Sequence, residues 1–99
     1  MLTNLLSNTD IAADLHGALA NARRLHILCL LTEGEHSVGA LADKVDLSQS
    51  ALSQHLAKLR AQQIVSTRRH GQTIYYSLTH DGARELIGRL DGLMRKAAS

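Results

Sequence analysis

Residues 48–63, SQSALSQHLAKLRAQQ, carry short hydrogen-bonding side chains and cations but no acid. At about 100° per residue around a helix axis, one side of this stretch gathers its leucines: Leu52, Leu56 and Leu59. The opposite side consists of small or amide side chains: Ser50, Gln54, Ala57 and Ala61. Ser53 and Lys58 flank them. Hydroxyls, amides and a cation without any acid indicate a surface that hydrogen-bonds to a negatively charged partner.

The acid-free stretch extends beyond this segment. Between Asp46 and Asp81 the chain has 34 residues, which include four Lys or Arg, three His and no acid, for a formal charge of +4. Residues 1–46 carry −3 and residues 81–99 carry +1. This asymmetry predicts a surface for a polyanion.

The pattern around this surface predicts short helices and one hairpin. Apolar residues at helical spacing predict helices over five segments: residues 11–20, 22–33, 38–45, 48–63 and 81–96. Cap residues are expected at the first three starts: Asn8, Thr9 or Asp10, then Asn21, then Ser37. Gly34 is expected to end the second helix. Over residues 64–78 the spacing alternates instead, which predicts two strands joined by a turn at His70-Gly71.

Length and composition predict one small domain over residues 1–99, mainly α with a small β-hairpin. The chain has no proline, phenylalanine or tryptophan, and aliphatic residues supply nearly all its apolar mass. No apolar run is long enough to span a bilayer, and the N-terminus lacks the features of a secretory signal. The single cysteine excludes an intrachain disulfide. We therefore expect a cytoplasmic protein with no membrane partner.

Residues 38–45, the turn at Asp46-Leu47 and the following helix predict a helix-turn-helix, whose second helix lies in the major groove of double-stranded DNA. A Gln can contact an adenine edge, Ser can donate or accept, Ala leaves room for a thymine methyl, and Lys reaches phosphate or guanine. The residues expected to contact DNA from this helix are Ser48, Gln49, Ser50, Ser53, Gln54, His55 and Lys58. The hairpin adds a cationic wing for the adjacent backbone or minor groove: Arg68, Arg69, His70 and Gln72.

The segment SVGALADKVDLSQSALSQHLAKLRAQQIVSTRRHGQTIYYSL closely resembles the DNA-binding core of winged helix-turn-helix repressors of the ArsR/SmtB family. The resemblance runs from about Ala18 to Leu78 and is nearest to the NolR and HlyU/BigR-like members. It implies a homodimer that binds a palindromic promoter element and represses transcription. It also implies that the first and last helices form the interface.

Apolar stripes on those two helices agree with a dimer. The residues expected at the interface are Ile11, Leu15, Leu19, Leu86, Leu90 and Leu93. The alternative is that the two stripes close the core of a monomer. We favour the dimer because small winged helices usually bind their operators with two-fold symmetry.

The metal sites that the resemblance would suggest lack their ligands. The family's Cys-x-Cys pair would fall on SVGAL, which has no cysteine, and its Asp-x-His motif would need a histidine at Ala83. No histidine follows His80, and the six histidines lack the i,i+3 or i,i+4 pairing of a zinc site. We therefore expect no metal and no cofactor.

Cys29 lies where HlyU/BigR-like members also place a cysteine. Those members bridge it to a second cysteine in the last helix, but residues 80–99 contain none. Two interpretations remain. We favour a small buried hydrophobe, and a single-thiol redox or reactive-sulfur sensor is the alternative.

Two other classes of function fit the sequence less well. A winged-helix module for protein partners would need an apolar or acid-containing recognition face, unlike Ser50, Gln54 and Lys58. An enzyme would need a nucleophile–base pair, a phosphate loop or a metal cluster, and none is visible in the sequence. The sequence therefore predicts a sequence-specific DNA-binding regulator and not an enzyme.

Overall fold

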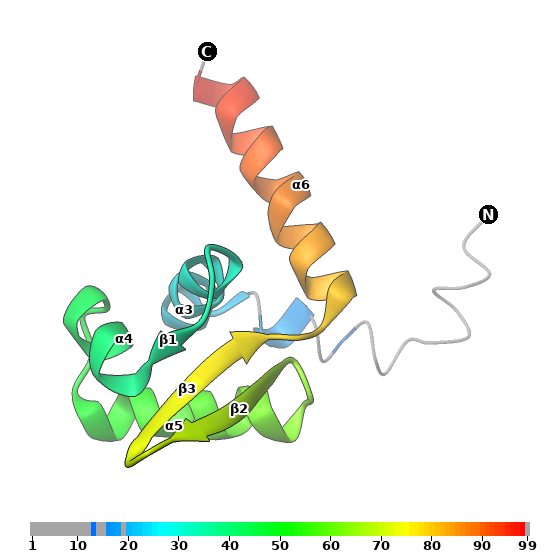
Figure 1. The fold of residues 1–99 in the computed structure, drawn as a ribbon. Helices are drawn as coiled ribbons and strands as arrows, with labels where there is room; N and C mark the ends of the chain where they lie inside the picture. The colour runs from blue at the N-terminus through cyan, green and yellow to red at the C-terminus, as the bar shows by residue number, and fades with distance from the viewer. Residues whose placement is uncertain (1–12, 14–15, 19, 99) are drawn as a thin grey trace.

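The computed structural model describes residues 13, 16–18 and 20–98. Its helices and strands follow in the order α3 (Ala22–Thr32), β1 (His36–Ser37), α4 (Val38–Lys44), α5 (Gln49–Ala61), β2 (Val65–His70), β3 (Thr73–Leu78) and α6 (Asp81–Ala98). The expected mainly helical fold with a small hairpin is confirmed (Figure 1). Each predicted helix that falls within the described part lies within two residues of its expected bounds.

Polar caps start three of these helices. The Asn21 side chain accepts hydrogen bonds from the backbone N–H groups of Arg23 and Arg24 at 3.0 and 3.1 Å. The Ser37 hydroxyl accepts one from Ala40 at 3.1 Å. Ser48 does the same for α5. Because the first N–H groups of a helix have no partner within it, these caps fix where the helices begin.

Helix α5 ends without a glycine. Gln63 follows it with φ of 60°, in the left-handed region that side chains other than Gly, Asn and Asp seldom adopt. The backbone N–H of Ile64 donates to the Leu59 carbonyl at 3.0 Å, which closes a Schellman-type end. Both of those side chains are buried, so the same turn anchors the helix end and directs the chain into β2.

The sheet has three antiparallel strands in the order β1-β3-β2. The β2–β3 hairpin pairs His70 with Thr73 next to the turn, and Gly71 adopts φ of 64° there, as a two-residue hairpin loop favours. The third strand, β1, was not expected, so the prediction of a hairpin alone was incomplete. A two-residue strand has no alternation for a sequence pattern to reveal, and its partner lies about forty residues further along the chain.

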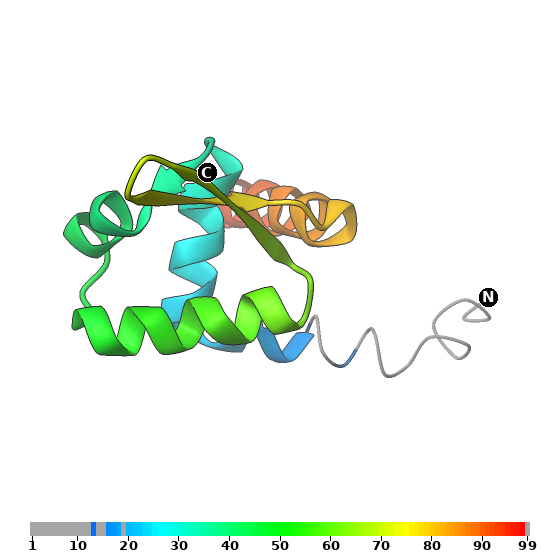
Figure 2. The ribbon, with the colours of Figure 1, turned by 60° about the horizontal axis from the view of Figure 1, so that its bottom comes forward.

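One hydrophobic core joins α3, α4, α5, the sheet and the start of α6. Figure 2 shows α5 along one side and the hairpin along the other, with α3 between them. The predicted inward leucines of α5 are all at most 1% exposed: Leu52, Leu56 and Leu59. Truncating a leucine buried this completely to Ala typically costs about 2–5 kcal/mol, so these side chains fix which side of α5 faces outward.

Helix α6 leaves the core part-way along its length and projects away from the other elements (Figure 1). Near its start, Ala83 and Ile87 are buried. Leu86 and Leu90 are half-buried, whereas Leu93 and Met94 are 58% and 63% exposed. The expected interface residues Ile11, Leu15 and Leu19 lie outside the described residues. Within the described part of the chain, no helix is long and apolar enough to cross a membrane.

Candidate nucleic-acid interface

A tight turn connects α4 and α5. Val45 ends α4 with its backbone N–H donating to the Leu41 carbonyl at 2.9 Å, and its side chain is buried. Leu47 packs against the same core. Ser48 then starts α5 with extended backbone angles. The two helices are therefore held as one unit by apolar side chains in the turn itself, which is the arrangement expected of a helix-turn-helix.

The outward side of α5 is mainly polar and exposed. It exposes these side chains: Gln49, Ser50, Ser53, Gln54, Ala57, Lys58 and Ala61. Among the described residues, none of the serine or glutamine side chains in that set has a hydrogen-bond partner. Their donors and acceptors are free to bind an external ligand. The predicted separation of a leucine side from a polar side is confirmed.

His55 lies at the margin of this side. Its side chain is half-buried, one position before Leu56 and near Arg24 of α3. Partial desolvation, followed by the charges of Arg24 and Lys58, lowers the pKa of the His55 imidazole. His55 is thus less exposed than Ser50 and Gln54. A contact between His55 and DNA stays a prediction.

The wing presents Arg69, His70 and Gln72 as exposed side chains around its turn. Arg69 has no ion pair among the described residues. Arg68, which we expected at the same tip, lies two residue pairs back from the turn, opposite Tyr75. Within the described residues, Arg69 near the tip of the wing is thus without an ion pair, whereas Arg68 lies midway along β2.

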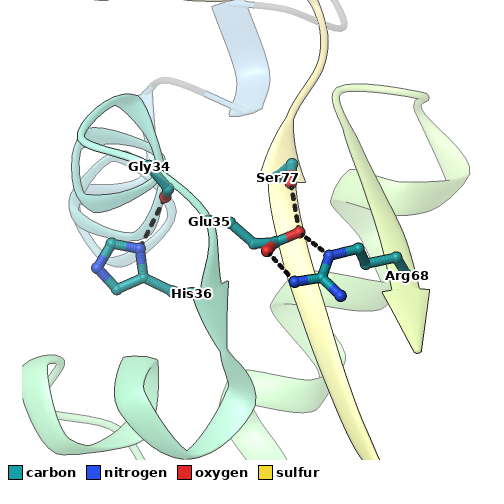
Figure 3. A network of polar contacts seen from close by, with 5 residues as sticks. All are labelled: Gly34, Glu35, His36, Arg68 and Ser77. Carbon is teal, nitrogen blue, oxygen red and sulfur yellow. Dashed lines mark hydrogen bonds and ion pairs between the residues drawn. The ribbon is translucent and has the colours of Figure 1, made fainter. Parts of the chain in front are cut away.

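Arg68 is held by Glu35, an acid that precedes the acid-free stretch of the sequence (Figure 3). Its Nε and Nη2 donate to the two carboxylate oxygens of Glu35 at 2.7 and 2.6 Å. Ser77 Oγ donates to the same carboxylate at 3.4 Å, and the guanidinium lies 4.6 Å from the centre of the Tyr75 ring. The hydrogen bonds from Arg68 hold the pKa of Glu35 below its usual range. Residues 47–80 contain no acid, but folding places the carboxylate of Glu35 against Arg68.

A shallow groove separates the wing from the helix-turn-helix. It is lined by residues of the α4 start, the α5 start and the wing: Ser37, Val38, Gly39, Gln49, Gln72, Thr73 and Ile74. The fold therefore brings Gln49 and Gln72, predicted on separate elements, to one concave surface. The start of α5 and the wing turn lie on the same side of the molecule.

Cys29 is exposed, so the expectation of a buried hydrophobe is wrong. Ile27, Leu28 and Leu31 take the inward side of α3, and Cys29 is turned away from them. It lines a groove between α3 and α6 together with Arg84, Asp91 and other residues. Partial desolvation, then the charges of Asp91 and Glu33, raise the pKa of the thiol. The reactive thiolate is therefore disfavoured.

Within the described residues, no group of three or more His, Cys, Asp or Glu side chains is placed to hold a metal ion. That the chain binds no metal stays a prediction.

Comparison with known proteins identifies the family. A model of the bacterial regulatory proteins of the arsR family matches residues 21–67. The chain is 56% identical over 86 residues to the nodulation protein NolR of Rhizobium meliloti, an alignment that covers 87% of this chain and 70% of NolR. The chain belongs to the ArsR family. This ArsR-family protein is a DNA-binding transcriptional regulator and not an enzyme.

Two further relatives extend the match across nearly the whole chain. The ArsR-family regulator is 45% identical to the transcriptional activator HlyU of Vibrio cholerae over 97% of its own length and 89% of HlyU. It also superimposes with a TM-score of 0.82 on a homodimeric winged helix-turn-helix DNA-binding domain from Mycobacterium bovis. That domain is 30% identical, with 94% of this chain and 86% of the other covered. The winged helix-turn-helix prediction is confirmed.

Proposed function

We propose that this ArsR-family regulator binds a palindromic operator as a homodimer, with α5 in the major groove and the wing on the adjacent backbone or minor groove. The observation that carries the proposal is the outward side of α5. Its serine and glutamine side chains are exposed and have no hydrogen-bond partner within the described part of the chain, while Leu52, Leu56 and Leu59 are buried behind them. Hydroxyl and amide groups at this spacing suit the edges of bases in a major groove.

The wing and α6 support the rest of the proposal. Arg69, His70 and Gln72 surround a turn that lies on the same side of the molecule as the start of α5. The second half of α6 exposes Leu93 and Met94, an apolar surface that a second copy would cover. The Mycobacterium bovis domain is described as homodimeric, which favours the same assembly here.

Repression is the outcome we propose for operator binding, and the cytoplasm is where we expect this protein to act. Among the relatives, the name of HlyU specifies activation and that of a biofilm growth-associated repressor specifies repression. A reporter gene placed behind the selected operator tests the direction. Reporter expression should fall when the regulator is present and recover when it is removed.

Selection from a pool of random duplex DNA tests the binding mode. We expect a palindrome whose half-sites lie about 10–10.5 base pairs apart, or a multiple of that spacing, because two recognition helices must enter successive major grooves. A single unrepeated site would contradict the homodimer. Recovery of no enriched sequence would contradict base-specific binding by α5.

Thiol-dependent release of DNA through Cys29 is a second candidate function. The exposure of this thiol, between α3 and α6, favours it. The raised pKa argues against it, because a protonated thiol reacts slowly with oxidants and electrophiles.

A further inference from the structure

Glu35 connects two parts of the molecule that lie far apart in the sequence. It follows the end of α3 and reaches Arg68, 33 residues later, through two charge-assisted hydrogen bonds. Ser77 on β3 provides a third contact to the same carboxylate, at 3.4 Å. One carboxylate thus binds side chains from both strands of the wing (Figure 3).

The residues that follow Glu35 lead directly into the helix-turn-helix. His36 and Ser37 form β1, which pairs with Tyr76 and Tyr75 of β3. The Ser37 hydroxyl then caps α4. The segment 35–37 therefore contacts the wing, adds a strand to its sheet and starts α4, the helix that precedes α5. A force on the wing would be transmitted to α4 through this short segment.

Arg68 is already engaged within the protein. Its Nε–H and one Nη2–H point to Glu35, and its guanidinium carbon lies over the Tyr75 ring. A bidentate pair fixes the plane of an arginine as well as its charge. Turning Arg68 towards a phosphate would break both hydrogen bonds and leave an acid beside the DNA.

We infer that Glu35 and Arg68 are positioning residues for DNA binding: their bidentate pair fixes the wing relative to α4 and α5, and Arg68 itself does not contact DNA. The inference rests on the proposed placement of α5 and the wing on DNA. It also revises the sequence-based expectation that Arg68 is a DNA contact. Arg69, the neighbouring cation, has no ion pair with any residue that the structure describes, and it is then the wing residue that contacts the phosphate backbone or minor groove.

The effect of Glu35→Gln on DNA affinity distinguishes a role of Glu35 in the charge of the surface from a role in positioning the wing. The substitution removes a negative charge near DNA and releases the Arg68 guanidinium. If charge alone mattered, affinity would rise and the dependence of affinity on salt would steepen by about one unit. If the pair holds the wing in place, affinity falls although the protein has become more positive.

The test compares Glu35→Gln, Arg68→Gln and the double variant on the selected operator and on random duplex at several salt concentrations. We expect each single variant to lose about threefold to fivefold in operator affinity, as for a well-formed exposed ion pair. The double variant should lose no more operator affinity than the single variant with the larger loss, because all three variants remove the same contact. The salt slopes should stay at the wild-type value, whereas Arg69→Gln should lower the slope by about one unit.

Two controls accompany the titrations. Glu85→Gln removes the same charge from another exposed pair, with Arg89 on α6, and should leave operator affinity unchanged. Thermal melting identifies a temperature at which every variant is fully folded, and the titrations are done there. A loss that persists at that temperature reflects the wing position and not unfolding.

Three results would overturn the inference. One is tighter binding by Glu35→Gln. Another is a reduced salt slope for Arg68→Gln, which would make Arg68 a phosphate contact. The third is additive losses in the double variant. Failure of the wild-type protein to enrich any duplex would overturn the proposed function as well, and it would be visible before any variant is made.

Discussion

The hydroxyl of Ser48 accepts a hydrogen bond from the backbone N–H of Ala51 at 3.2 Å. This contact caps α5 at the point where the chain leaves the turn after α4. Because Ala cannot accept this bond, Ser48→Ala should lower the free energy of unfolding by about 1 kcal/mol. Denaturant unfolding measures the change. Ser50→Ala is the matched control, since its exposed hydroxyl has no partner among the described residues, and it should stay within about 0.5 kcal/mol of wild type.

The Ser48→Asp variant distinguishes the role of Ser48 as a helix cap from its proposed role in contacting DNA. Aspartate caps a helix as well as serine does, and its charge is favourable at a helix N-terminus, so stability should be retained. The same carboxylate would lie beside DNA phosphates in the proposed complex, so operator affinity should fall by tenfold or more, about 1.4 kcal/mol. Wild-type affinity in this variant would show that the start of α5 does not face DNA.

The exposed end of α6 should be the subunit contact. Leu93 is 58% exposed, and burying the exposed part of this side chain in a dimer contributes about 1–2 kcal/mol per subunit. Leu93→Asp should therefore shift the protein from dimer to monomer in sedimentation experiments and weaken operator binding. Gln62→Asp adds the same charge at an exposed position after α5 and should leave the dimer intact. A dimer that survives Leu93→Asp would place the interface elsewhere.

Local patterns predicted much of this fold from the sequence. Asn21 and Ser37 cap the helices that they were predicted to start, because each lies directly before a run with apolar residues at helical spacing. Leu52 and Leu56 are buried because they share one side of α5, and the complementary polar side follows from the same geometry. These features depend on residues within four positions of one another.

The features that the sequence did not predict depend on distant residues. Glu35 contacts Arg68 only because β1 adds to the sheet beside β3, and no local spacing encodes that pairing. The exposure of Cys29 depends on which side of α3 the leucines occupy and on how α6 leaves the core. A charge count along the chain cannot detect an acid that folding brings back to a basic hairpin.

His55 should make the stability of the free protein depend on pH. Because folding lowers the pKa of this imidazole, the folded state favours neutral His55 more than the unfolded state does. Its contribution to stability is complete above the unfolded value of about 6.5 and is lost as pH falls through the lower folded value. Unfolding experiments from about pH 5 to about pH 7.5, roughly 1.5 units below and 1 unit above that value, should show this loss of stability in wild type. The loss should be smaller in His55→Gln. His70→Gln, at the exposed wing turn, serves as the control, and an equal effect in both variants would contradict the assignment.

The Cys29 thiol should react slowly, and Asp91 should be one reason. With the thiol pKa raised by desolvation and by nearby carboxylates, alkylation at neutral pH should be slower than for free cysteine. Asp91→Asn should accelerate it, whereas Asp43→Asn on α4 should not. Cys29→Ser should keep wild-type operator affinity, because this side chain lies on α3 and away from α5. If an oxidant or polysulfide weakens operator binding by wild type but not by Cys29→Ser, the thiol is a sensor.

Gln54 and Arg69 should differ in the kind of DNA contact they make. Gln54 lies on the exposed side of α5 and has no hydrogen-bond partner in residues 13, 16–18 and 20–98, so its amide can bind a base edge. Gln54→Ala should therefore cost about 1–3 kcal/mol on the selected operator and little on random duplex. Arg69 lies one pair from the wing turn, where its charge can meet phosphates or a narrow minor groove. Arg69→Ala should weaken binding to both DNAs more evenly and reduce the salt slope by about one unit.

Titrating both variants on both DNAs at several salt concentrations separates base contacts from backbone contacts. The difference between operator and random DNA isolates the sequence-dependent part of the binding free energy, and the salt slope isolates the part that comes from counterion release. Equal losses on the two DNAs for Gln54→Ala would mean that α5 anchors the protein without recognising bases. If neither variant lost affinity on either DNA, the basic surface from Leu47 to His80 would bind DNA through other residues than these two, and the proposed placement of α5 and the wing would be wrong.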